Sequence, residues 1–258
     1  MSVWDSYKNR ITASGCSLRD ASLKRELHML SSRLSDSLSY HSVTIDDMTR
    51  EIAVKNSDNL NEKTIYAVDK NIIRGGSLVS WMDSHWLVVE CDANAEIYTT
   101  AKMVQCNYLL KWVDTDGIIH EQWCVIEDGT KYLIGEYEDR NFIVTRGDSR
   151  IAMTIAKNDA TLKFCRETRF LIDDPDSEVK LSYLLTKPLK VGLVYNTGGV
   201  YSFVLQEVVS TDDDNHALGI ADYYKYFPKD TNQDTNSDEE SVVDPDSNID
   251  DNGRQVWL

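Results

Sequence analysis

The chain has 258 residues, of which 41% are hydrophobic, so it is long enough for one large or two small domains with a buried core. Its net charge of −16 argues against a protein that coats nucleic acid. No apolar run approaches the ~20 residues that span a bilayer, and the N-terminus lacks the charged and apolar regions of a secretory signal.

The first 40 residues predict a helical arm made of two helices. The first covers residues 3–14 and carries Trp4 and Tyr7, and the second begins after Ser17, which is placed to cap it. The second helix either packs on its own domain or docks on a neighbouring subunit, and charge does not decide between the two. Its contact face is a row of leucines at spacings of four and three, namely Leu23, Leu27, Leu30, Leu34 and Leu38.

From Tyr40 onward the apolar residues alternate with a period of two, which is typical of strands. The clearest strand covers residues 103–113, and a turn at 114–117 leads into another strand at 118–126. A second hairpin signal precedes a strand at 130–134. Successive hairpins without an intervening helix favour an antiparallel barrel or sandwich, and we assign residues 41–145 to a β-barrel.

A second β-region is expected over residues 146–228. Its short strand-like segments and turns fit an immunoglobulin-like β-sandwich. Residues 229–258 carry nine acidic and two basic side chains and are rich in Asp, Asn and Ser, so we expect a disordered acidic tail. The predicted fold class is therefore mainly β, with a helical arm at residues 1–40, a barrel, a sandwich and a tail.

The sequence lacks the usual catalytic and metal-binding motifs. His120-Glu121 has no second histidine at the spacing of a zinc protease, and the residues from Asp244 onward lack the glycine of a calcium loop. Five cysteines without a close pair favour reduced, mostly buried thiols over structural zinc. We expect no enzyme, no metal and no cofactor, although a site dispersed in sequence stays open as an alternative.

Seven basic and three acidic residues lie between Arg140 and Arg169. This segment is either a solvated face or a contact for acidic neighbours or DNA phosphates, since arginine pairs well with carboxylate and phosphate groups. The predicted interaction residues combine these arginines with the helical arm: Trp4, Tyr7, Leu23, Leu27, Leu30, Leu34, Arg140, Arg146, Arg150, Arg166 and Arg169.

Several stretches resemble known phage proteins. Residues 76–81, followed by residues 85–90, resemble the barrel opening of phage head-closure (stopper) proteins, in which a glycine-led strand and a short turn precede an aromatic-aliphatic strand. Residues 105–112, 136–142 and 221–224 are similar to structural proteins of tailed phages. The second β-region and the acidic tail depart from the compact stoppers.

The resemblance implies a virion structural protein of the head–tail connector, made in the host bacterial cytoplasm. It implies a homo-oligomeric ring that contacts portal or adaptor proteins and tail proteins, surrounds packaged DNA without reading its sequence, and has no membrane partner. Two alternatives remain open. One is a tail or baseplate component with an adhesion-type β-domain, and the other is a hydrolase with a site dispersed in sequence.

Overall fold

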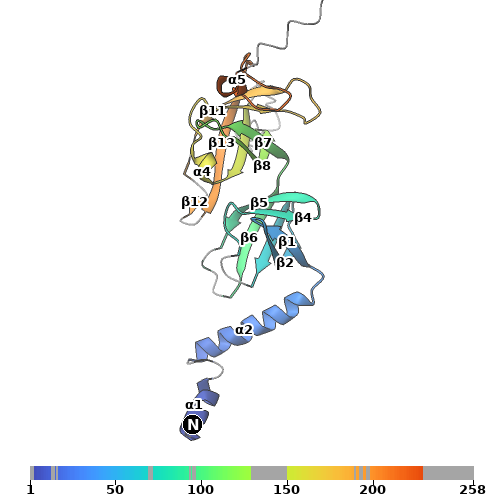
Figure 1. Ribbon diagram of the computed structural model, residues 1–258. Coiled ribbons are helices and arrows are strands. Elements are labelled where there is room, and N and C mark those ends of the chain that lie inside the picture. The colour runs from blue at the N-terminus through green and yellow to red at the C-terminus, as the bar shows by residue number, and fades with distance from the viewer. Residues whose placement is uncertain are drawn as a thin grey trace, which may run out of the picture. The chain divides into compact units, whose positions relative to one another are not determined.

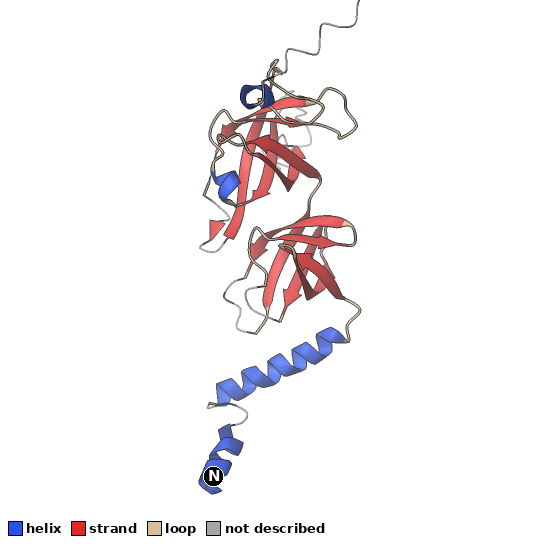
Figure 2. Cartoon of the chain, in the orientation of Figure 1, coloured by secondary structure: helices blue, strands red, loops and turns tan. Residues whose placement is uncertain are grey.

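A computed structural model describes residues 3–12, 15, 17–68, 72–92, 94, 97–128, 150–188, 190–191, 194–195 and 198–228. Strands dominate these residues, as predicted, and the long helices lie at the N-terminus (Figures 1 and 2). Three predicted features lie outside the described residues: the strand at 130–134, the two arginines Arg140 and Arg146, and the acidic tail.

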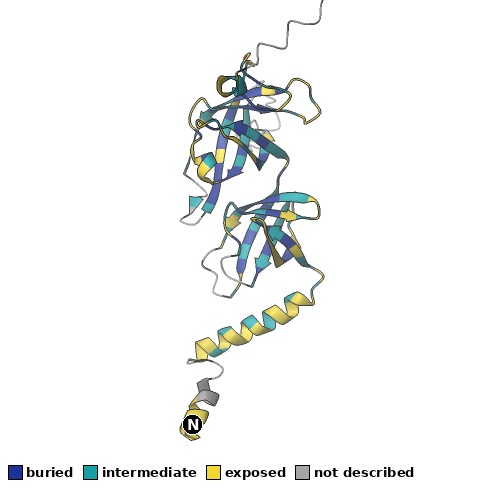
Figure 3. Cartoon of the chain, in the orientation of Figure 1, coloured by how far each residue is buried: buried dark blue, intermediate teal, exposed yellow. Residues whose placement is uncertain are grey.

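The N-terminal arm consists of α1 (Val3–Thr12) and α2 (Leu18–Ser35). Ser17 caps α2 as predicted, because its side-chain oxygen accepts a hydrogen bond of 3.1 Å from the amide of Asp20. The helix ends at Ser35, so Leu38 lies beyond it and is 98% exposed. The expected face of five leucines is therefore a face of four, and no residue of α2 is buried (Figure 3).

The first sheet is a closed antiparallel barrel in the order β1-β2-β3-β6-β5-β4. Each strand alternates its side chains, so that Val43, Ile52, Ile65, Val88 and Met103 fill the interior. The Asp46-Asp47 turn joins the first two strands with φ of 46° and 66°, as two-residue hairpins require. The strands are β1 (Tyr40–Ile45), β2 (Met48–Asn56), β3 (Glu62–Ala67), β4 (Leu78–Trp81), β5 (Ser84–Cys91) and β6 (Thr99–Gln105).

The second sheet has the order β10-β11-β13-β9-β8-β7, with β12 paired to β13. Phe164, Phe170, Phe203 and Trp112 form its aromatic core, in which Phe164 makes edge contacts with the other three rings. The strands are β7 (Tyr108–Val113), β8 (Ile119–Asp128), β9 (Arg150–Ala156), β10 (Arg169–Ile172), β11 (Leu181–Lys187), β12 (Val194–Tyr195) and β13 (Gly198–Val208), and two short helices accompany them, α4 (Asp159–Leu162) and α5 (Tyr223–Tyr226).

The immunoglobulin-like prediction is wrong for this second region. An immunoglobulin-like sandwich packs two separate sheets face to face, whereas here the strands join in one hydrogen-bonded sheet. The two ends of that sheet meet, since the Tyr108 hydroxyl of β7 donates a hydrogen bond of 3.1 Å to the Leu171 carbonyl of β10. The region is therefore barrel-like.

The chain passes from the first sheet to the second well before residue 145, where the domain boundary is predicted. Residues 103–113 do not form one strand, because β6 ends at Gln105 and β7 begins at Tyr108 in the other sheet. At the break, the Asn107 side-chain amide donates to the Ile126 carbonyl at 2.7 Å, and its oxygen accepts from the Ile126 amide at 2.8 Å. Asn107 thus hydrogen-bonds to β8 through its side chain, just before β7 begins to pair with it.

The barrel and the second sheet belong to one compact unit that ends at Tyr226. Leu87 and Cys106 form a buried apolar cluster with Val125, Ala156 and Val200 of the second sheet. Next to this cluster, the rings of His85 and Trp123 stack with their centroids 4.3 Å apart. The junction is therefore packed by side chains from both sheets as well as joined by the chain.

Candidate interaction sites

The N-terminal helices present their predicted contact residues to solvent. Trp4 is 69% exposed and Tyr7 is 55% exposed, and their rings meet edge to face at 5.9 Å. The two rings form one small exposed apolar patch, and it is such patches, more than single exposed residues, that mark interaction surfaces. The four leucines of α2 are each half-buried, and none is enclosed by the rest of the described chain: Leu23, Leu27, Leu30 and Leu34.

The predicted contact arginines do not form one group. Arg150 opens β9, opposite Gln206 of β13. Arg166 lies in the turn that precedes β10 and is exposed. Arg169 begins β10, and its side chain is only 10% exposed. The three described arginines therefore lie in different local environments, and no pattern in the sequence distinguishes them.

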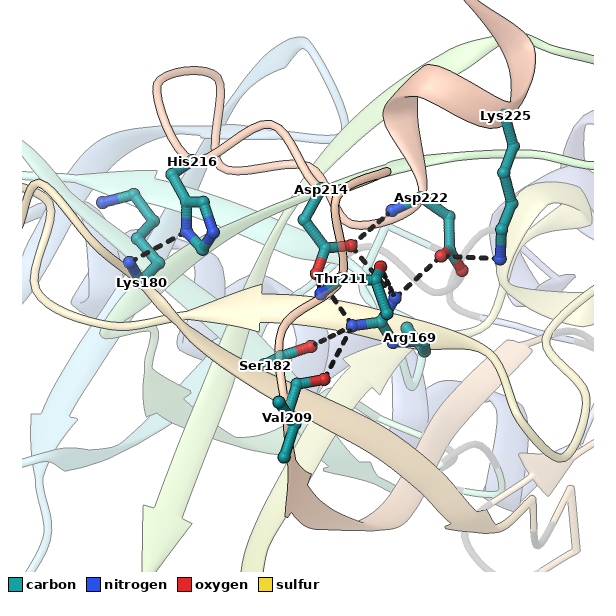
Figure 4. Close-up of polar contacts among 9 residues, drawn as sticks. All are labelled: Arg169, Lys180, Ser182, Val209, Thr211, Asp214, His216, Asp222 and Lys225. Carbon is teal, nitrogen blue, oxygen red and sulfur yellow. Dashed lines mark hydrogen bonds and ion pairs between the residues drawn. The ribbon is translucent and has the colours of Figure 1, made fainter.

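Arg169, which is predicted to contact a partner, is held in a hydrogen-bond network within its own chain, and little of its side chain is exposed. Its Nη2 donates to Asp214 Oδ2 at 2.8 Å and to Ser182 Oγ at 2.8 Å (Figure 4). Its Nη1 donates to Asp222 Oδ1 at 2.8 Å and to Thr211 Oγ1 at 2.6 Å. The planar guanidinium thus ties β10 and β11 to the segment that follows β13.

The carboxylate of Asp214 is the centre of this network. Its side chain has no exposed surface, and it also accepts hydrogen bonds from the amides of Thr211 and Asp222 at 2.8 and 2.9 Å. Burial alone raises the pKa of Asp214, but these two amides and the Arg169 guanidinium outweigh it and hold the pKa below the ordinary value. Asp222 adopts a left-handed backbone with φ of 54° while making these contacts.

A second polar cluster lies beside an open pocket of about 300 Å³. Lys163 Nζ lies 2.5 Å from both Asp114 Oδ2 and Asp116 Oδ2, and these two carboxylates raise the pKa of Lys163 to about 12. Burial alone raises the pKa of Asp114, but hydrogen bonds from Lys163 and Thr115 lower it overall. Because each of these pKa shifts has a paired partner, the cluster is an ion-pair network.

Another pocket of about 440 Å³ lies where the loop before β4 meets the second sheet. The backbone of Gly76, with φ of 87°, approaches Gly199 so closely that a Cβ on Gly76 would lie 2.2 Å from the Gly199 carbonyl oxygen. A Cβ on Gly198 would likewise lie 2.4 Å from the Gly75 oxygen. These four glycines allow two backbones to touch, and they form what we call the glycine contact: Gly75, Gly76, Gly198 and Gly199.

Four of the six tryptophans lie between residues 74 and 135, and they are mainly core residues. Trp86 is 4% exposed in the barrel, and Trp112 is 3% exposed in the second sheet. Trp81 and Trp123 are half-buried and pack against Trp86 and His85, respectively. These four side chains therefore offer little contact area to a partner.

In the part of the chain that the structure describes, no group of three or more His, Cys, Asp or Glu side chains is arranged to hold a metal ion. Over the same residues, neither α1 nor α2 nor any shorter helix has the length and apolar character needed to cross a membrane.

Comparison with known proteins gives one family match. The model of a family described as the YomX N-terminal domain matches residues 20–105, which run from α2 to the last barrel strand. This is a phage-associated domain, and its end coincides with the break between the two sheets. Most of the chain lies outside the match, and no curated protein matches.

One solved structure has a weak similarity to the chain. It is described as MrkH, a novel c-di-GMP dependence transcription regulatory factor. The two share 10% sequence identity over 74% of this chain and 86% of that one, with a TM-score of 0.23. A superposition of this quality carries no argument about function.

Proposed function

We propose that the protein is a virion structural protein of the head–tail connector, which forms a ring that closes the head after DNA packaging and joins it to the tail. The observation that carries this proposal is the match of residues 20–105 to a phage-associated domain. Residues 40–105 of this match fold as a closed barrel, and they contain the stretch at 76–90 that resembles stopper proteins.

The described geometry supports a role in assembly. A closed barrel leaves no strand edge for uncontrolled pairing, so subunits of this kind associate through side chains and appended segments. The chain offers such a segment in α1 and α2, where Trp4 and Tyr7 are exposed and the four leucines of α2 are half-buried. Ring neighbours, a portal or adaptor protein and tail proteins are the partners proposed for these surfaces.

Charge is compatible with a channel that holds DNA without gripping it. The net charge of −16 disfavours strong phosphate binding over most of the surface. Arg169, the most buried of the described candidate arginines, is already neutralised by Asp214 and Asp222. The contact with packaged DNA is accordingly proposed to be weak and independent of sequence.

A tail or baseplate component is the second candidate, favoured by the additional β-region that compact stoppers lack. Position in the particle separates the two candidates. The hydrolase alternative requires a pocket in which titratable groups with shifted pKa converge on a substrate. Asp114 and Lys163 line the pocket of about 300 Å³ and both have shifted pKa values, but they form an ion pair with each other. This pairing favours the structural proposals.

The proposal is tested by mixing the purified protein with DNA-filled, tailless heads that carry a portal. The expected result is stable binding and slower loss of DNA from the heads. Heads that lack the portal are the matched control and should bind no protein. Equal binding of the protein to heads with and without the portal would rule out the connector role. So would a protein that neither binds the portal-bearing heads nor slows the loss of their DNA.

A further inference from the structure

The leucines of α2 follow the spacing of a two-helix seam. Leu23, Leu27, Leu30 and Leu34 are separated by four, three and four residues, which places Leu27 and Leu34 at heptad position a and Leu23 and Leu30 at position d. All four lie on one side of an 18-residue helix that has no buried residue. An apolar stripe of this regularity stabilises a helix only when another surface covers it.

A second copy of α2 matches this stripe in length and chemistry. When two such helices run antiparallel, Leu23 faces Leu34 of the other copy and Leu27 faces Leu30, so the two-fold axis generates four leucine layers. Every leucine of the stripe then has a leucine partner, and no polar residue enters the seam. The same patch on both copies forms the contact, as in most two-fold homodimers.

Charge decides the orientation of the two helices. Glu26 and Arg33 occupy heptad position g and are exposed. In an antiparallel pair, g faces g, so Glu26 of each copy lies beside Arg33 of the other and two opposite-charge pairs form. In a parallel pair, g faces e, and Glu26 would meet the neutral Ser31 instead.

From the seam and these charges, we infer that α2 binds a second copy of this chain as an antiparallel helix pair. The contact is separate from any lateral contact in a ring, and it does not rest on the proposed role in the head–tail connector. It is short, with four leucines from each chain, so the pair dissociates readily on dilution unless other contacts hold the copies together.

The full-length protein tests this inference by analytical ultracentrifugation over a range of concentrations. The wild type is expected to show a concentration-dependent dimer. Leu30→Glu places a charge in the seam and should abolish the dimer, whereas Ser32→Glu places the same charge on the opposite side of α2 and should leave it intact. Circular dichroism of both variants checks that the strands remain folded.

Charge reversal tests the orientation. Glu26→Arg alone and Arg33→Glu alone should each weaken dimerisation on the order of tenfold, because two attractive pairs become repulsive. The double variant, with both substitutions, should recover wild-type dimerisation. If neither reversal has an effect, the antiparallel pairing is wrong.

Other outcomes also overturn the inference. A protein that stays monomeric at all concentrations, with α2 protected from hydrogen exchange, packs this helix on its own chain. An oligomer that survives Leu30→Glu assembles through another surface, and in that case the connector proposal stands while the α2 pair fails. Conversely, loss of head binding by a protein that still dimerises through α2 would count against the connector role alone.

Discussion

Replacing Arg169 with alanine is expected to destabilise the second sheet more than any exposed charge substitution. The change removes six hydrogen bonds, three of which go to the carboxylates of Asp214 and Asp222. It leaves the fully buried Asp214 side chain without its counter-charge. Removing one partner of a buried ion pair costs about 3–5 kcal/mol.

The lower end of that range applies here. Asp214 keeps the hydrogen bonds from the amides of Thr211 and Asp222, so part of its charge stays compensated. We therefore expect a loss of about 3 kcal/mol in the free energy of unfolding, which corresponds to a melting temperature lower by about 6–12 °C for a unit of this size. Arg169→Lys should recover only part of the loss, because an ammonium cannot reproduce the planar fork.

Urea unfolding followed by circular dichroism and tryptophan fluorescence measures this effect. Arg166→Ala is the matched control, since Arg166 is exposed and lies three residues away, and it should change stability by less than about 0.5 kcal/mol. An Arg169→Ala protein as stable as this control would refute the structural role assigned to the network.

The same network predicts an acid-sensitive stability. Folding lowers the pKa of Asp214, so the ionised carboxylate contributes fully to the stability of the fold above the ordinary carboxyl pKa. This contribution to stability is lost as the pH falls through the lower folded-state pKa. Wild-type protein should therefore lose stability as the pH falls below about 4, and Asp214→Asn should show a weaker dependence on pH in that range. An unchanged pH profile in this variant would contradict the assignment.

Two further predictions concern the glycine contact and the thiols. Gly76→Ala should lower the free energy of unfolding in urea by about 2–3 kcal/mol, because the added Cβ would overlap the Gly199 carbonyl. Gly75→Ala is the control and should cost much less, since its Cβ would have no neighbour nearer than 3.5 Å. Equal losses in the two variants would refute the close approach. Iodoacetamide at pH 8 should label the exposed Cys165 in the folded protein, and mass spectrometry of peptides would show this. Cys106 should be labelled only after unfolding, because burial raises the pKa of its thiol to about 12. Rapid labelling of Cys106 in the folded protein would contradict its burial.

The strands were predictable wherever the side-chain period was regular. In β9, Met153 and Ile155 alternate with smaller residues, a pattern typical of a strand, and both side chains are fully buried. The cap of α2 was predictable because Ser17 accepts its hydrogen bond from the amide of Asp20, only three residues further along the chain. Local signals of this kind do not depend on the rest of the fold.

The division into two sheets was not predictable in the same way. The apolar period continues through residues 103–113, although the chain leaves one sheet and enters the other at Cys106 and Asn107. Which strands pair depends on contacts distant in sequence, such as those between β8 and β9 across the undescribed residues 129–149. Alternation indicates a strand but carries no information about its neighbours.

The structural role of Arg169 was hidden for a related reason. Its acidic partners lie 45 and 53 residues further along the chain, within an Asp-rich segment that gave no sign of being buried. Arginine in a basic stretch looks the same in sequence whether it faces solvent or a buried carboxylate. The exposed residues Trp4 and Tyr7, by contrast, remain predicted contacts that only a partner can test.

Cryo-electron microscopy of intact particles that carry a tagged copy of the chain tests the proposed role most directly. The account predicts a ring of closed six-stranded barrels, formed by residues 40–105, at the junction between head and tail. Barrels found at the baseplate or along the tail, or a particle that lacks the chain altogether, would contradict it.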